Sequence, residues 1–323
     1  MIQTLPLVLF IVLAELSIGA FTILFVLDWR SEVKRSFLIL YGLIYIVLTG
    51  LTYLFQQSFS SPALLNSFTQ LDKAWTGHLA LPLLLFLLLM LPYNLLLWLD
   101  KKAGVDGREK GRTRTSPVRV LRLLVGGLAV LAGLTTLFVL AMIYRPIAST
   151  NVGGVLTVAG FFAAALALGG VMTAMWLGHW YLVTPALSEK PLLFATSLVL
   201  LGILLQVILA ISAGPMTTYA NRPSTPATTA TAPATPVVSG ATPTANPSIK
   251  PANAPVATPL SAEVIGWLRI LVSFVMPLIL GGFILKLIRD RSFQSATGML
   301  YLVVVLTLAG EALARGLFLM GLS

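Results

Sequence analysis

The sequence contains no cysteine and very little charge. With no cysteine among its 323 residues, the chain cannot form a disulfide, hold an iron–sulfur cluster through thiolates or attach a c-type haem. It has only two histidines, so a metal-rich site is not expected. Charged residues make up 10% of the chain and hydrophobic residues 57%, whereas a soluble domain carries roughly 25% charged residues. The composition therefore indicates a protein that crosses a membrane several times.

Eight apolar segments are long enough to cross a bilayer, which takes about 20 mostly apolar residues per helix. They are 5–27, 36–55, 77–99, 121–144, 153–182, 192–213, 264–286 and 295–319. We therefore expect an all-α polytopic transmembrane bundle of about eight spans. The first segment, "MIQTLPLVLF", lacks a basic region and a cleavage site, so we interpret it as a retained span.

The basic residues predict the orientation of the bundle. Fifteen of the 21 Lys and Arg residues lie in connections on one side, four lie on the other side and two lie within spans. Cytoplasmic loops carry the excess of Lys and Arg, which places both termini outside the cytoplasm. We expect a multi-pass protein of a bacterial or archaeal cytoplasmic membrane. The net charge of +10 then requires no nucleic acid, and a second role for the basic loop 100–119 is binding anionic lipid.

Residues 214–260 differ in kind from the rest of the chain. They are dominated by Pro, Thr and Ala, and only Arg222 and Lys250 are charged. Such a segment cannot bury a core, which predicts a disordered linker outside the cytoplasm. The predicted organisation is therefore spans one to six in 1–213, a linker in 214–260, and spans seven and eight in 261–323.

Five charged or titratable residues are expected within the spans or at their outer ends. Glu15 lies near the middle of span one, and Glu311 and Arg315 lie in the outer half of span eight. Arg269 lies about two turns into span seven, and His78 begins span three. Ionisable residues at membrane depth are costly and are usually functional or paired. These five are our candidates for binding a quinol head group, the alternative being ion pairs that only fix helix packing.

The local sequence indicates which of these groups face protein. Glu311 and Arg315 are four residues apart, so they share one helical face and can pair. Glu15 is surrounded by the small residues Ala14, Ser17, Gly19 and Ala20, a composition typical of closely packed membrane helices. We therefore expect Glu15 to face other helices and not lipid.

The two histidines do not suit a shared haem. His78 lies at the outer end of its span, whereas His179 lies about 39 Å down span five, at the inner end. Ligation by one histidine with a methionine remains a weaker possibility. His179 is flanked by Trp176, Trp180 and Tyr181, which favours an aromatic belt at the membrane boundary. We expect no haem or metal in this chain.

Three stretches resemble the membrane-anchor subunits of the dimethyl sulfoxide reductase family. "LTLAGEALARGLF" is similar to that family's last span, with matches at Ala309, Gly310, Glu311, Arg315 and Gly316. "LPLVLFIVLAELSIGAF" is similar to its first span, and "SSPALLNSFTQL" carries its Ser-Pro and Asn-Ser pairs at Ser61, Pro62, Asn66 and Ser67. That family also has eight spans with both termini outside.

The resemblance implies a non-catalytic anchor subunit of a molybdopterin oxidoreductase. Such an anchor binds quinol or menaquinol as its substrate and passes electrons to an iron–sulfur subunit beside the molybdopterin catalytic subunit. The family has a histidine a few residues before the Ser-Pro, whereas this chain reads "QQSFSSP" there. Quinol chemistry would then rest on His78 or on the acidic residues. The loops 56–76 and 145–152 would dock the iron–sulfur partner.

Two other functions are compatible with the sequence. A secondary transporter or permease often has helices broken near the midplane, and Pro82, Pro92 and Pro277 could break spans three and seven. The sequence shows no symmetric pair of interrupted segments. A cofactor-free membrane scaffold is the third alternative, in which the charges only hold helices together.

Overall fold

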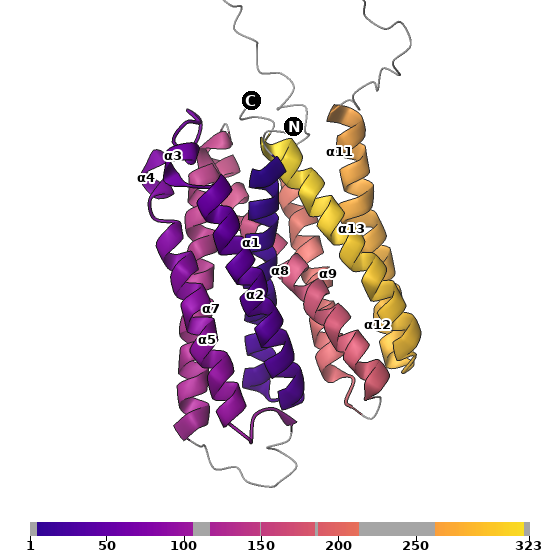
Figure 1. Cartoon of the computed structure of the whole chain (residues 1–323). Helices are drawn as coiled ribbons and strands as arrows, with labels where there is room; N and C mark the ends of the chain where they lie inside the picture. The colour runs from indigo at the N-terminus through magenta and orange to yellow at the C-terminus, as the bar shows by residue number, and fades with distance from the viewer. Residues whose placement is uncertain (1–4, 106–116, 149, 185–186, 213–261, 320–323) are drawn as a thin grey trace, which may run out of the picture.

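The computed structural model describes residues 5–105, 117–148, 150–184, 187–212 and 262–319, which are almost wholly helical (Figure 1). The predicted linker 214–260 lies outside the described residues. The long helices and their segments are α1 (Leu5–Arg30), α2 (Arg35–Phe59), α5 (Ala80–Leu99), α7 (Pro117–Tyr144), α8 (Asn151–Val183), α9 (Lys190–Ser212), α11 (Ala262–Ile270), α12 (Met276–Arg289) and α13 (Phe293–Leu319). Short turns of helix are α3 (Pro62–Leu65), α4 (Lys73–Thr76) and the 3₁₀ turn η2 (Arg145–Ile147).

Eight helices in the described part of the chain are long and apolar enough to cross a membrane, which confirms the predicted all-α polytopic bundle. The predicted spans coincide with these helices. The longest, predicted over 153–182, is the single uninterrupted helix α8. Helix α1 begins and helix α13 ends at the same end of the bundle, as an even number of spans requires (Figure 1).

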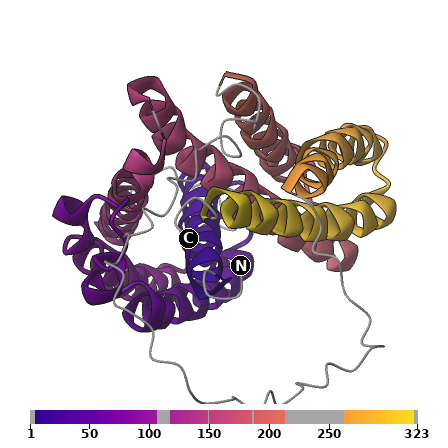
Figure 2. The same ribbon diagram turned by 90° about the horizontal axis from the view of Figure 1, so that it is seen from above.

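The eight spans form two groups of four that follow one another along the chain. In the first group, α1, α2, α5 and α7 pack in a ring, each helix against the next. In the second group, α8, α9, α12 and α13 do the same. The groups meet where α1 packs against α8 and α13. Figure 2 shows α1 near the middle of the bundle, between the two groups.

Helix α1 is the buried centre of this arrangement. In its most apolar stretch 83% of residues are buried, compared with at most 50% in any other span. Ala14, Ser17, Gly19 and Ala20 are all buried, which confirms that this face of α1 contacts protein. Gly19 and Gly169 of α8 bring the two backbones together, since a Cβ atom at either would collide with the other helix. This close approach is the usual role of small residues between membrane helices.

Span seven is interrupted close to Pro277. Between α11 and α12 the residues Leu271–Val275 form a short π-helix, here labelled η3, and Pro277 follows in the first turn of α12. Proline lacks an N–H donor and so disturbs the hydrogen-bond ladder of the preceding turn. Pro82 and Pro92, in contrast, lie within the continuous helix α5. Of the three possible breaks expected from proline, only the one at Pro277 coincides with a change of helix type.

Candidate functional site

A cluster of charged side chains lies where the two groups of helices meet. Arg315 of α13 forms ion pairs with Glu15 of α1 and with Glu311 of its own helix, and its Nε lies 2.9 Å from Glu311 Oε1. Gln206 of α9 donates from Nε2 to Glu311 Oε2 at 3.1 Å. All three charged residues are buried. The cluster thus connects α1, α9 and α13 through side chains that the bilayer could not solvate.

Aromatic rings complete the surroundings of Arg315. Its Cζ atom lies 4.0 Å from the ring centroid of Phe161 on α8, within the range of a cation–π contact. Phe161 stacks in turn on Tyr144, with centroids 6.1 Å apart and planes inclined by 16°. The guanidinium is therefore held by two carboxylates at its edges and an aromatic face beside it.

The cluster has an excess of negative charge and contains polar atoms without a hydrogen-bond partner. Two carboxylates share one guanidinium, so the ionised cluster has a formal charge of −1. Among the described residues, the buried Glu15 Oε2 and Tyr144 hydroxyl have no hydrogen-bond partner. Buried polar atoms are normally hydrogen-bonded, so each such atom calls for a reason. A group that brings a proton or a hydrogen bond into the cluster would improve its balance.

The chain positions this cluster through two local features. The Glu311–Arg315 spacing places both side chains on one face of α13, as the sequence predicted. Gly310, the residue before Glu311, lets α13 approach the π-helix η3, because a Cβ there would come within 2.8 Å of Ser273 Cα. The charged face of α13 is thereby directed into the bundle.

The other two candidates lie in different surroundings. His78, in the connection between α4 and α5, is exposed, and its Nδ1 lies 3.1 Å from the Ala74 carbonyl oxygen. Arg269 is half-buried at the end of α11, and its guanidinium lies 5.7 Å from the Phe274 ring centroid. Of the five predicted site residues, the structure joins Glu15, Glu311 and Arg315 in direct contact.

The residues that match the Ser-Pro and Asn-Ser pairs organise the connection between α2 and α5. Ser61 precedes α3 and Pro62 begins it, a position that suits proline. Asn66 Oδ1 accepts a hydrogen bond of 2.9 Å from Thr76 Oγ1 in α4, and Ser67 Oγ donates to the Leu64 carbonyl. These four residues therefore have a local structural explanation.

A second buried cluster, which the sequence interpretation missed, lies at the opposite end of α1. Arg122 of α7 pairs with Asp28 Oδ1 at 3.0 Å and with Asp100 Oδ2 at 2.6 Å. The Tyr93 hydroxyl donates to Asp28 Oδ2 at 3.0 Å. By sequence, Arg122 counts among the basic residues of the connection 100–122, but the structure places it in α7 with its side chain only 1% exposed.

The sequence did contain a signal for this second cluster. The chain has only 11 acidic residues, and two of them, Asp28 and Asp100, each end an apolar run at the basic side of the bundle. Acids at that depth need a cationic partner. Within the described residues, His, Asp and Glu side chains do not gather in threes as metal ligands would.

No protein-family model matches the chain, and neither a curated protein nor a solved structure shows significant similarity to it. The fold and the buried clusters define an all-α, multi-pass membrane protein. The resemblance to the dimethyl sulfoxide reductase anchors remains a prediction from short sequence matches.

Proposed function

We propose that this chain is the membrane-anchor subunit of an oxidoreductase complex, and that it oxidises quinol or menaquinol. One observation carries the proposal: Glu15, Glu311 and Arg315 form a buried cluster with excess negative charge between the two groups of helices. The match in span eight includes Glu311 and Arg315, and the stretch that resembles span one contains Glu15. The cluster lies in the half of the bundle that the positive-inside rule places away from the cytoplasm.

The chemistry of quinol suits such a cluster. Oxidation of a quinol to a quinone releases two electrons and two protons. A carboxylate within hydrogen-bond reach of a quinol hydroxyl can accept a proton, as in general base catalysis. Uptake of one of the two protons would bring the formal charge of the cluster from −1 to zero, and the second proton would leave to water at the outer end of the bundle. Arg315 would stay paired with the remaining carboxylate and position it.

The electrons would leave on a partner subunit. The chain has no cysteine, so an iron–sulfur cluster held by thiolates would belong to a second protein. The turns α3 and α4 lie at the same end of the bundle as the start of α1 and the end of α13 (Figure 1). Asp72, which precedes α4, donates from its backbone N to the Ile143 carbonyl oxygen of α7 at 3.1 Å, and η2 directly follows α7. This surface, together with residues 56–76 and 145–152, is our proposed docking site for the iron–sulfur subunit and its molybdopterin partner.

A transporter is the second candidate, and the π-helix η3 favours it. Short π-helical turns inside α-helices often occur at functional sites. Here Ser273 of η3 packs against Gly310, one residue before Glu311. An interrupted helix beside a buried carboxylate is also the arrangement expected where a proton or cation binds in a carrier.

The variant Glu311→Gln tests the proposal. The amide keeps the size of the side chain but cannot accept a proton at neutral pH. We expect quinol oxidation, measured with menadiol in membranes that contain the whole complex, to fall roughly 100-fold. Assembly should be unchanged. The matched control is Asp100→Asn, which also removes one of two carboxylates from a buried arginine but lies at the other end of the bundle.

Under the quinol proposal, Asp100→Asn lowers stability and leaves turnover per assembled complex near the wild-type value. Equal turnover in Glu311→Gln and the wild type would remove the cluster from the reaction. Two results together would favour the transporter. The wild type would show solute-dependent flux in proteoliposomes but no quinol turnover, and Glu311→Gln would abolish the flux.

A further inference from the structure

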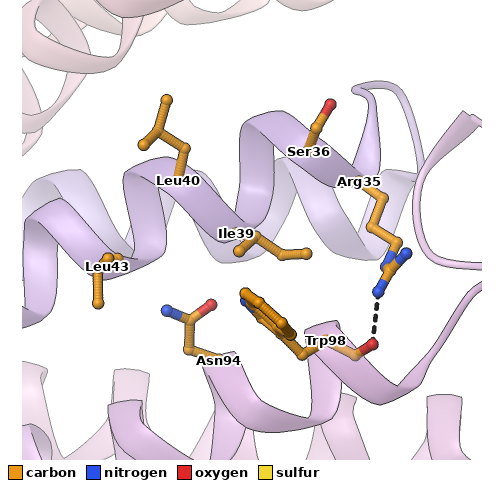
Figure 3. Close-up of a pocket in the computed structure, with 7 residues that line it drawn as sticks. All are labelled: Arg35, Ser36, Ile39, Leu40, Leu43, Asn94 and Trp98. Atoms are coloured by element: carbon orange, nitrogen blue, oxygen red, sulfur yellow. Dashed lines mark hydrogen bonds between the residues drawn. The ribbon is translucent and has the colours of Figure 1, made fainter.

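A groove opens between α2 and α5 at the basic end of the bundle (Figure 3). Its volume is about 680 Å³, within the range of small-ligand sites. Arg35, Ile39 and Leu43 line it from α2, and Asn94 and Trp98 line it from α5. Leu43 and Trp98 are exposed on the outer surface of the helices. Because this surface faces the bilayer, the natural occupant of the groove is a molecule of the membrane itself.

The basic end of the groove carries a guanidinium fixed in place. Arg35 donates from Nε to the Leu97 carbonyl oxygen at 2.9 Å and from Nη2 to the Trp98 carbonyl oxygen. These bonds hold the side chain against the last turn of α5. They use two of the five N–H donors of a guanidinium, which leaves donors and a full positive charge for an anion. Arg and Lys pair readily with phosphate at a membrane surface.

An amide lies deeper in the same groove. Asn94 is 8% exposed, and its Oδ1 is packed against Gly42 without a hydrogen-bond partner in the described residues. The Nδ2 group makes no hydrogen bond with the described residues and is not among their buried atoms without a partner, so it can donate to a ligand in the groove. An amide in a lipid-facing groove is costly unless its polar atoms are satisfied.

The two polar groups are separated by a distance that matches a phospholipid. The Arg35 guanidinium is bonded to the Trp98 carbonyl oxygen, and Asn94 lies about one helical turn before Trp98 on α5. The amide therefore lies about 6 Å deeper in the bilayer than the guanidinium. The interfacial layer of a bilayer, from head groups to the start of the hydrocarbon, is about 5–7 Å thick on each side. A phosphate at Arg35 would therefore place the glycerol ester carbonyls near Asn94.

We propose that this groove binds one anionic phospholipid from the cytoplasmic leaflet. Arg35 holds the phosphate, Asn94 Nδ2 donates to an ester carbonyl, and an acyl chain lies along Ile39 and Leu43. The indole of Trp98 lies at the interface, where tryptophan is enriched. Charge complementarity selects an anionic lipid, since Lys34, Lys101 and Lys102 lie at the same end of the bundle. The site is independent of quinol chemistry.

Fluorescence quenching by brominated lipid tests the proposal on the full chain in proteoliposomes. The contribution of Trp98 is the difference between the wild type and Trp98→Phe. We expect phosphatidylglycerol with brominated acyl chains to quench this contribution at a mole fraction roughly fivefold lower than brominated phosphatidylcholine. Arg35→Gln should abolish this preference, whereas Lys101→Gln, which removes the same charge outside the groove, should retain it.

Asn94→Leu provides an independent test, because it removes the amide without removing a charge or a hydrogen bond to the backbone. It should weaken quenching by both lipids and should not lower the melting temperature. Equal quenching by the two lipids in the wild type would overturn the proposal. So would an equal loss of preference in Lys101→Gln and Arg35→Gln, which would indicate diffuse surface charge. Displacement of brominated phosphatidylglycerol by stoichiometric decylubiquinone would assign the groove to a quinone instead.

Discussion

At the scale of residues, the chain places two triads of the same composition along one helix. Each triad joins two carboxylates to one arginine, and α1 contributes Glu15 to one and Asp28 to the other. Thirteen residues separate these acids, which is about 20 Å along a helix. The triad around Arg122 has a tyrosine donor on Asp28 and ties the ends of three helices together. Both triads have the same formal charge of −1, but among the described residues only the triad around Arg315 has a carboxylate oxygen without a hydrogen-bond partner, Glu15 Oε2. We therefore assign the triad around Arg122 a structural role and propose the quinol chemistry for the triad around Arg315.

The structural role of Arg122 predicts a large loss of stability when it is removed. Arg122→Leu removes the ion-pair partner of two buried carboxylates, and breaking a buried pair in this way costs about 3–5 kcal/mol. The melting temperature in detergent should fall accordingly. The triple variant Arg122→Leu, Asp28→Asn, Asp100→Asn should recover most of the loss, because no unpaired charge remains in the triad. Failure of the triple variant to recover stability would contradict the ion-pair account.

Part of this residue-scale picture was predictable. The spacing of Glu311 and Arg315 predicts their contact, because four residues return a helix to the same face. Their contact with Glu15 was not predictable, since it depends on which helices neighbour one another. Arg122 was missed because its position beside a run of basic residues resembles a loop, and only the fold shows that α7 already begins at Pro117.

At the scale of elements, the contact between α1 and α8 determines how the two groups of helices meet. Gly19 and Gly169 face each other at the crossing, where the helices touch through their backbones. Without a hydrophobic driving force in lipid, such close packing is a main source of helix association. The same contact fixes the position of Glu15, four residues before Gly19, and so the geometry of the charged cluster.

Two glycines of α8 allow a controlled test of this packing. A Cβ at Gly169 would collide with the backbone of Gly19 and Ala20, whereas a Cβ at Gly160 would meet nothing within 4 Å. Gly169→Val should therefore lower the free energy of unfolding by about 3 kcal/mol or prevent folding, at the upper end of typical overpacking. Gly160→Val should change it by less than about 1 kcal/mol. The measurement is thermal unfolding of both variants in the same detergent, and similar melting temperatures would contradict the packing account.

The elements themselves were largely predictable, because length and hydropathy decide a membrane span. The π-helix was not. Pro277 indicates a disturbance in span seven, but proline alone does not specify whether a helix kinks, breaks or widens. Pro92 shows the other outcome, since α5 continues through it.

At the scale of the whole molecule, the alternation of basic and neutral connections predicts the topology. The ends of the bundle differ in charge by sequence, and the structure places the start of α1 and the end of α13 at the same end (Figure 1). Grouping into two sets of four helices was not predictable, because the sequence shows no internal repeat and hydropathy does not specify neighbours.

The absence of native cysteine makes the orientation directly measurable. Ser212→Cys and Ser188→Cys each introduce one thiol at an exposed position, at opposite ends of α9 and outside the proposed docking surface. In intact cells, a membrane-impermeant maleimide should label Ser212→Cys and leave Ser188→Cys unlabelled until the membrane is opened. The reverse pattern would invert the topology and place the charged cluster in the cytoplasmic half.

The most direct test of the proposed function is to identify what accompanies the chain in its native membranes. The tagged protein would be purified in mild detergent and its partners identified by mass spectrometry, with iron and molybdenum measured in the same sample. The proposal predicts an iron–sulfur protein and a molybdopterin enzyme in stoichiometric amounts, with iron–sulfur centres that menadiol reduces. A chain that purifies alone, stable and free of both metals, would contradict the anchor proposal.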